Sequence, residues 1–444
     1  MSLHESEIRF LLVNPTASPW RVKKGDKPSR ATKVFRFSML TSLSVAAAAP
    51  PWVRTRIVDE DVEPLDFDVS ADLVGISCMT FNAPRAYEIA ARFRERGTRV
   101  ILGGYHPTFM PEEALLHANA VCVGEAETVL PRMMEDFAGG RLRGVYRGEV
   151  TNLKDLRRPD RSLISEGAYP RAEPIQATRG CPNTCRFCSV STFFRNTFRA
   201  RPVDDVVEEL GGLGRFILFL DDNLTADPEY ARELFSRMIP LRKMWFSQAS
   251  VDIASDPELV QLAAASGCRG LFLGLESVCQ ESLAGWDKGS NIASDYKRAI
   301  GSIHDRGIAV LAAVVFGSDE DTPGIFHKTL SFLQEARVDA LQATILTPFP
   351  GTPLFSQLEE QGRIIDRDWS KYDFANVVFR PAGMSENALR QGQQRVLTRF
   401  YSRSRIFGRV LGQMGYLSPS TMLTATVPVN ISYRRRLTAN QTLL

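Results

Sequence analysis

The sequence of 444 residues lacks any uninterrupted apolar run of about 18 residues, the length that a membrane-spanning helix requires. It also lacks an excess of one charge. Its 54 basic and 51 acidic residues leave a net charge of +3, without the basic footprint of a nucleic-acid-binding protein, so we expect no nucleic-acid partner. The N-terminus has no basic region followed by an apolar stretch, so we expect no secretory signal and a cytoplasmic location.

Cysteine and histidine are scarce, with seven and five residues. Three of the cysteines, Cys181, Cys185 and Cys188, nevertheless fall within eight residues. In a long chain without a secretory signal, such clustering predicts a metal or redox site rather than a disulfide framework. The apolar share of 44% and the charged share of 24% are ordinary for a globular protein, and the length predicts about two or three domains.

The first part of the sequence alternates short apolar runs with helical patterns. Continuous apolar strands separated by helices predict a parallel, doubly wound, Rossmann-like sheet over residues 1–139. Such sheets bind ligands at the carboxyl ends of their strands. The expected strands cover residues 8–14, 54–59, 72–77, 99–104 and 120–124.

A second series of strands and helices follows an irregular stretch, residues 140–174, which we expect to be a linker. This series predicts a partial (β/α)6 TIM-type barrel over residues 175–380, and in such barrels the loops after the strands build the active site. The expected strands cover residues 175–179, 216–220, 245–250, 270–276, 310–316 and 341–346.

The last segment, residues 381–444, is expected to be mainly helical. One helix is expected near residues 386–410 and carries six arginines. These arginines are typical of a solvated or domain-packing face, and they are also compatible with contact to an anionic membrane surface.

The strongest chemical signal is RGCPNTCRFCSV, in which the cysteines have the spacing CxxxCxxC. An iron–sulfur cubane normally binds four thiolates, so three on one loop leave one iron open to a small molecule. A structural zinc site needs four ligands, usually in two separated pairs, and no fourth cysteine or histidine lies near this loop. Gly180, Pro182 and Asn183 are turn residues, which argues against buried core cysteines.

At this motif the sequence resembles the radical S-adenosylmethionine (SAM) superfamily, over about residues 175–380. The resemblance implies a [4Fe-4S] cluster whose open iron binds SAM. One electron from the cluster cleaves SAM to a 5′-deoxyadenosyl radical, which removes a hydrogen atom from the substrate. It also implies an electron donor such as flavodoxin or ferredoxin, and it identifies no catalytic residue. Phe187, just before the third cysteine, matches the aromatic residue that the family prefers near the adenine.

Several later strand ends also match this family, and the resemblance assigns them to SAM. An acidic pair after a strand is by itself more often a turn or a helix cap. The succession of such strand ends after one CxxxCxxC motif favours the SAM interpretation. The assigned residues are Phe187, Asp221, Asp222, Gln248, Glu276 and Ser277.

A doubly wound domain ahead of such a barrel resembles the cobalamin-binding (B12-binding) radical SAM subgroup. Gly103 and Gly104 would let backbone approach a flat ligand closely. None of the histidines lies in the DxHxxG motif that places histidine on cobalt, so we expect no protein imidazole on the metal. The residues that the resemblance assigns to cobalamin are Asn14, Ser77, Gly103, Gly104, His106, Gly124 and Glu125.

Two alternatives stay open for this domain. His106 is also compatible with a turn histidine bonded to backbone, and a domain of this shape can lose its cofactor and remain as a packing or lid domain. A methylthiotransferase is not favoured, because that group carries an additional N-terminal cluster. Only Cys78 and Cys122 precede Cys181, and both look like small core residues.

The subgroup resemblance implies an enzyme that methylates an unactivated carbon of a small molecule, with methylcobalamin as the methyl source. By analogy with the subgroup, a hydrophobic substrate such as a lipid, terpenoid or tetrapyrrole is expected. The alternative reaction is a radical cyclisation or oxidation, as in the anaerobic porphyrin cyclase branch, with or without cobalamin. A non-catalytic corrinoid or iron–sulfur sensor would differ from both, since it would release no 5′-deoxyadenosine.

Overall fold

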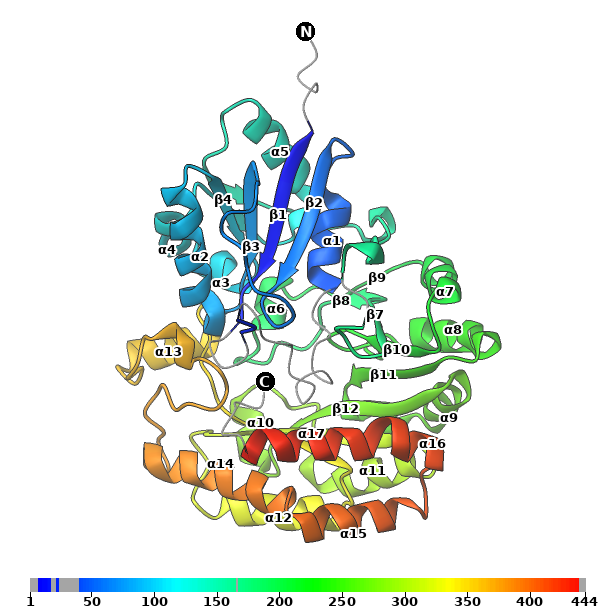
Figure 1. The fold of residues 1–444 in the computed structure, drawn as a ribbon. Helices are drawn as coiled ribbons and strands as arrows, with labels where there is room; N and C mark the ends of the chain where they lie inside the picture. Colours follow the sequence, from blue (N-terminus) through cyan, green and yellow to red (C-terminus); the bar gives the residue numbers. More distant parts are fainter. Residues whose placement is uncertain (1–6, 17–20, 24–39, 165–166, 439–444) are drawn as a thin grey trace. The chain divides into compact units, whose positions relative to one another are not determined.

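The computed structural model describes residues 7–16, 21–23, 40–164 and 167–438, which belong to two compact units (Figure 1). Across these described ranges, no helix combines the length and the apolar character needed to cross a bilayer. Unit 1 comprises Met1–Pro170, Phe349–Gly351 and Asp368–Tyr372, and unit 2 comprises Arg171–Pro348, Thr352–Arg367 and Asp373–Leu444.

Unit 1 is built on a six-stranded parallel sheet in the order β2-β1-β3-β4-β5-β6. Its central strands are buried on both faces, as the continuous apolar runs predicted; Val13, Val74 and Val100 have no exposed surface. The doubly wound fold is thereby confirmed. The strands are β1 (Ile8–Asn14), β2 (Val53–Asp59), β3 (Leu73–Ser77), β4 (Arg99–Gly103), β5 (Ala120–Val123) and β6 (Gly144–Arg147).

Helices cover both faces of this sheet. Ala86 and Ile89 of α2 join one apolar cluster, and Leu43 of α1 and Met133 of α5 join the other. The helices are α1 (Leu40–Ala48), α2 (Ala83–Glu95), α3 (Tyr105–Phe109), α4 (Pro111–His117) and α5 (Leu130–Ala138). Strand β6 lies inside the stretch expected to be an irregular linker, and sequence reasoning missed it because its four residues are too few to show a pattern.

Unit 2 contains a second six-stranded parallel sheet, in the order β14-β13-β12-β11-β10-β7, which forms a partial TIM-type barrel. The strands are β7 (Glu173–Ile175), β10 (Phe216–Phe219), β11 (Met244–Ala249), β12 (Cys268–Glu276), β13 (Ala309–Phe316) and β14 (Ala340–Ile345). The intervening helices are α7 (Val203–Gly212), α8 (Pro228–Met238), α9 (Pro257–Ser266), α10 (Gln280–Gly285), α11 (Tyr296–His304), α12 (Ile325–Glu335) and α13 (Pro353–Glu360).

The first expected barrel strand, residues 175–179, is split in two, which corrects the prediction of one strand. β7 ends at Ile175, and the chain then leaves the sheet to form β8 (Thr178–Arg179), which pairs antiparallel with β9 (Arg199–Ala200). The side chain of Asp221 causes the split, because it takes the backbone N–H groups of Ala177 and Thr178 that a continuing strand would use.

The C-terminal region is helical, but the single helix expected near residues 386–410 is two helices, α14 (Glu386–Phe400) and α15 (Arg403–Gln413). The break lies at Ser402, whose backbone is extended with a ψ of 151°. Tyr401, directly before it, anchors this point of the chain to β14. Its buried hydroxyl donates to the Leu341 carbonyl of β14 at 2.6 Å and accepts from the Leu341 N–H at 2.8 Å. The chain continues through α16 (Pro419–Thr421) and a π-helical turn (Met422–Thr426) into α17 (Val427–Thr438).

Candidate cluster and cofactor sites

The cysteine motif forms a loop whose two ends are joined by the β8–β9 pair. Gly180, directly before Cys181, has a φ of 82°, and a Cβ there would lie 2.0 Å from the Thr197 carbonyl oxygen. Only glycine therefore fits at this position. Helix α6 (Ser189–Phe193) begins directly after Cys188, and Ser191 Oγ donates back across the loop to the Asn183 carbonyl at 2.7 Å.

The acidic pair after β10 holds the chain that leads into this loop. Asp221 is fully buried and accepts hydrogen bonds from the Ala177 N–H at 3.1 Å and from the Thr178 hydroxyl at 2.6 Å. Asp222 Oδ2 accepts from the Gly180 N–H at 2.9 Å. Burial raises the pKa of Asp221 to about 7 and that of Asp222 to about 6, against the opposing effect of these hydrogen bonds. Both residues thus orient the cysteine loop, and their predicted contact with SAM stays a prediction.

The three thiols influence one another electrostatically. Burial raises the pKa of Cys185 to about 11; the nearby Lys288 ammonium lowers it, and the other two thiols of the loop raise it. Among the described residues, no group of three His, Cys, Asp or Glu side chains is arranged to hold a single metal ion. Thiolates that bind a cubane each contact a different iron and need not converge on one point. Three cysteines on one short loop are the ligand set that such a cluster with one open iron requires.

Two neighbouring segments clamp the loop between its second and third cysteines. The Arg186 N–H donates to the Trp286 carbonyl at 3.1 Å, and the Phe187 ring packs edge-on against the Trp286 indole with centroids 5.4 Å apart. From the other segment, the Leu354 N–H donates to the Arg186 carbonyl at 3.1 Å. The Arg186 guanidinium donates to Gln357 Oε1 at 2.9 Å. Sequence reasoning missed Trp286, which belongs to no motif.

A buried ion pair lies at the end of β12. Glu276 has a φ of 62°, an unusual conformation for a residue other than glycine, beside a register shift against β13. Its Oε1 lies 3.3 Å from Lys288 Nζ, and both side chains are close to nine-tenths buried. Burial alone would lower the pKa of Lys288, but the facing carboxylate and the cluster-loop thiols outweigh it and raise that pKa. Lys288 is therefore a cation beside the cysteine loop, and no sequence motif indicated it.

The remaining residues assigned to SAM lie on the same edge of the unit 2 sheet. Gln248 is exposed near the end of β11, and its carbonyl accepts from the Leu224 N–H at 3.3 Å. Ser277 follows β12, is buried, and its Oγ accepts from the Cys279 N–H at 3.1 Å. Because β10, β11 and β12 are parallel neighbours, the sheet gathers the assigned strand-end residues along one edge. Their contacts with SAM stay predictions.

The residues assigned to cobalamin lie at the carboxyl edge of the unit 1 sheet. Asn14, Ser77 and Gly103 end the adjacent strands β1, β3 and β4, and Gly124 and Glu125 follow β5. Asn14 Oδ1 accepts from the Ser42 hydroxyl at 2.7 Å. Glu125 is buried, and its carboxylate accepts from the Thr151 N–H at 2.9 Å.

Gly104, the next residue after β4, has a φ of 99°, and a Cβ there would lie 2.7 Å from the Cys78 carbonyl oxygen. Gly124 is also left-handed, with a φ of 80°. Two glycines at neighbouring strand ends keep this edge free of bulky side chains. The arrangement fits a flat ligand that approaches the backbone.

His106 is enclosed within unit 1 and has no exposed surface. Its Nε2 lies 3.1 Å from the Tyr87 hydroxyl and 3.2 Å from Glu113 Oε1, and the Trp369 indole N–H also donates to Glu113 at 3.0 Å. Burial opposes ionisation of Glu113, but its hydrogen bonds outweigh this and lower its pKa. The ring is thus bonded to side chains rather than to backbone. Its buried Nδ1 has no hydrogen-bond partner among the described residues.

Comparisons with known proteins agree with this geometry. Residues 51–133 match the B12 binding domain, residues 175–333 match the Radical SAM superfamily, and residues 352–440 match a domain of unknown function (DUF4070). The chain is 33% identical over 391 residues to the bacteriochlorophyllide d C-12(1)-methyltransferase of Chlorobaculum tepidum, covering 84% of this chain and 85% of that protein.

A further relative and a solved structure extend the comparison. The chain is 28% identical to the anaerobic magnesium-protoporphyrin IX monomethyl ester cyclase of Cereibacter sphaeroides, over 77% of this chain and 61% of that one. Its fold matches the radical SAM methyltransferase TsrM from Kitasatospora setae, solved with cobalamin and a [4Fe-4S] cluster bound. That match has a TM-score of 0.67 at 16% identity, and it covers 98% of this chain and 100% of that chain.

These matches confirm the resemblance that the cysteine motif and the domain order indicated. They also confirm the expected cofactors, a [4Fe-4S] cluster, SAM and cobalamin. The glycine-lined edge of unit 1 and the three-thiol loop of unit 2 suit those groups. The chain belongs to the family of cobalamin-dependent radical SAM methyltransferases.

Proposed function

We propose that this protein methylates an unactivated carbon of a hydrophobic small molecule, and that the substrate is a tetrapyrrole. The observation that carries the proposal is the 33% identity to a bacteriochlorophyllide d methyltransferase, which extends over 84% of the chain and so spans both units. A flavodoxin or a ferredoxin is the proposed electron donor.

When bound, the cluster and SAM supply the radical that activates the carbon, and cobalamin supplies the methyl group. Cys181, Cys185 and Cys188 would hold the cluster. Asp221 and Asp222 would keep the entry to the cysteine loop in place by accepting hydrogen bonds from the backbone N–H groups of residues 177, 178 and 180. The strand ends after β10, β11 and β12 would hold SAM by polar contacts that fix its ribose and its amino acid part.

The reaction is tested with bacteriochlorophyllide d as the probe and SAM that carries an isotopic label in its methyl group. We expect reconstituted, reduced enzyme to add one labelled methyl group to the probe, as measured by mass spectrometry, and to release 5′-deoxyadenosine. Omitting cobalamin should stop the methyl transfer. Release of 5′-deoxyadenosine with a cyclised or oxidised product and no labelled methyl group would contradict the proposal.

A separate prediction concerns the lower face of bound cobalamin. None of the histidines lies in a DxHxxG motif, and the fully buried His106 ring has its Nε2 engaged by Tyr87 and Glu113, while its Nδ1 has no partner among the described residues. We expect the electron paramagnetic resonance spectrum of the cob(II)alamin state to lack nitrogen hyperfine splitting from a protein imidazole. His106→Gln should leave that spectrum unchanged. Nitrogen splitting that disappears in His106→Gln would place this imidazole on cobalt instead.

A further inference from the structure

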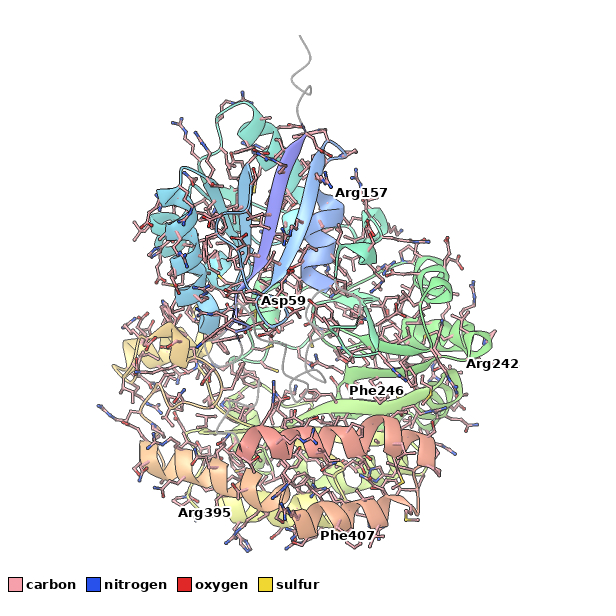
Figure 2. All side chains as sticks on the ribbon, viewed as in Figure 1. Asp59, Arg157, Arg242, Phe246, Arg395 and Phe407 are labelled. Atoms are coloured by element: carbon pink, nitrogen blue, oxygen red, sulfur yellow. The ribbon has the colours of Figure 1, made fainter. Side chains whose placement is uncertain are left out.

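Helix α15 presents a row of exposed apolar side chains. Phe407, Leu411 and Met414 are 65%, 51% and 68% exposed, although large apolar side chains in this chain are mostly buried. Their spacing of four and three residues places them within an arc of about 60° around the helix axis. We call these three residues the α15 stripe; Figure 2 labels Phe407 at the lower margin of unit 2.

The other side of α15 is fixed to the body of unit 2. Gln413 has no exposed surface, and its Nε2 donates to Asp339 at 2.8 Å. The Arg409 guanidinium lies 3.8 Å from the centre of the Phe400 ring and donates to Asn430 Oδ1 at 2.6 Å. The helix is therefore anchored along one side, so the exposure of the stripe does not come from a loosely attached helix.

The surroundings of the stripe are strongly basic. After Glu386 the sequence contains nine arginines and no lysine, aspartate or glutamate, whereas the preceding residues contain 45 basic and 51 acidic ones. Arginines are exposed along both α14 and α15, and within the described ranges none of them forms an ion pair. These exposed arginines are Arg390, Arg395, Arg399, Arg403 and Arg405.

Apolar side chains beside arginines on one anchored helix are typical of a surface that lies in the interface of a lipid bilayer. Arginines add attraction to anionic lipids, and the apolar side chains add burial among the acyl chains. A symmetric contact with a second copy of this chain would bring arginine against arginine, and Glu386 at the start of α14 is the single acidic side chain of α14 and α15 that could compensate. We propose that α14 and α15 dock on an anionic lipid surface through the α15 stripe and four of these arginines, Arg390, Arg395, Arg399 and Arg403. Arg405 lies on the opposite side of α15 from the stripe and takes no part.

Vesicle co-sedimentation of the full chain tests this proposal. We expect binding to vesicles of equal parts phosphatidylglycerol and phosphatidylcholine, and much weaker binding to pure phosphatidylcholine. The triple variant Phe407→Ser, Leu411→Ser, Met414→Ser should bind the anionic vesicles at least about tenfold more weakly. As the matched control, Leu116→Ser on α4 removes a side chain that is 74% exposed in unit 1 and should bind like the natural sequence.

The electrostatic part has its own variant. Arg395→Gln, Arg399→Gln and Arg403→Gln, combined, should weaken binding to anionic vesicles by roughly fivefold per arginine at low salt. The difference in vesicle binding between this triple variant and the natural sequence should shrink as the salt concentration is raised. Circular dichroism and iron content should be unchanged in both sets of variants, because the substituted side chains are exposed.

The proposal is overturned if the natural chain does not bind anionic vesicles, or if the α15-stripe variant binds them as the natural chain does. Analytical ultracentrifugation tests whether a second copy of this chain binds to the same face instead. Self-association that is lost in the stripe variant, without vesicle binding by the natural chain, would make this face an interface between copies and would also overturn the proposal.

Discussion

Replacing Cys185 with alanine is expected to abolish the iron–sulfur cluster. Anaerobically reconstituted natural protein should contain about four irons and four sulfides per chain, with broad charge-transfer absorption. With only three protein thiolates available, removal of one leaves two irons without a protein ligand. Cys181→Ala and Cys188→Ala should have the same effect. Iron analysis and the visible absorption spectrum measure the outcome.

Two other cysteines of unit 2 provide matched controls. Cys279 is partly exposed, and its thiol lies 3.0 Å from a Glu281 carboxylate oxygen rather than in the cysteine loop. Cys268 is fully buried at the start of β12, at the opposite end of the strand from Glu276. Cys279→Ala and Cys268→Ala should therefore retain full iron content. An intact cluster in Cys185→Ala protein would remove the cysteine loop as the cluster site.

The parts that could be predicted from the sequence depend on local patterns. Buried parallel strands such as β4 and β13 appear as continuous apolar runs, and three cysteines within eight residues are visible without any structure. The strand-end position of Asp221 was also predictable, because it directly follows the apolar run of β10. Each of these features can be recognised from a stretch of about ten residues of sequence.

The parts that could not be predicted depend on partners far away in the chain. The break between β7 and β8 requires the Asp221 carboxylate, 44 residues beyond Ala177. The surroundings of His106 include Trp369, which lies 256 residues beyond the Glu113 carboxylate that both contact. No local sequence pattern indicates such contacts, because they arise only when distant elements pack against one another.

Lys288 was missed for the same reason, and its replacement by methionine has the second large expected effect. The Glu276 carboxylate would remain nearly buried without its cation, and removal of one partner from a buried ion pair costs about 3–5 kcal/mol of folding free energy. Denaturant unfolding of the protein without its cofactors should show a loss of this size. The cluster should also become harder to reduce, because a positive charge beside its thiolates is gone.

The double variant Lys288→Met, Glu276→Gln separates the ion pair from simple packing. It removes both charges and keeps side chains of similar size, so no buried charge is left without a partner, and it should recover most of the stability lost in Lys288→Met. Glu276→Gln alone leaves the ammonium unpaired beside the cysteine loop. The reduction potential of the cluster should therefore shift in the positive direction in this variant, opposite to the shift in Lys288→Met. Potentials that shift in the same direction in both single variants would show that this pair does not act on the cluster through its charge.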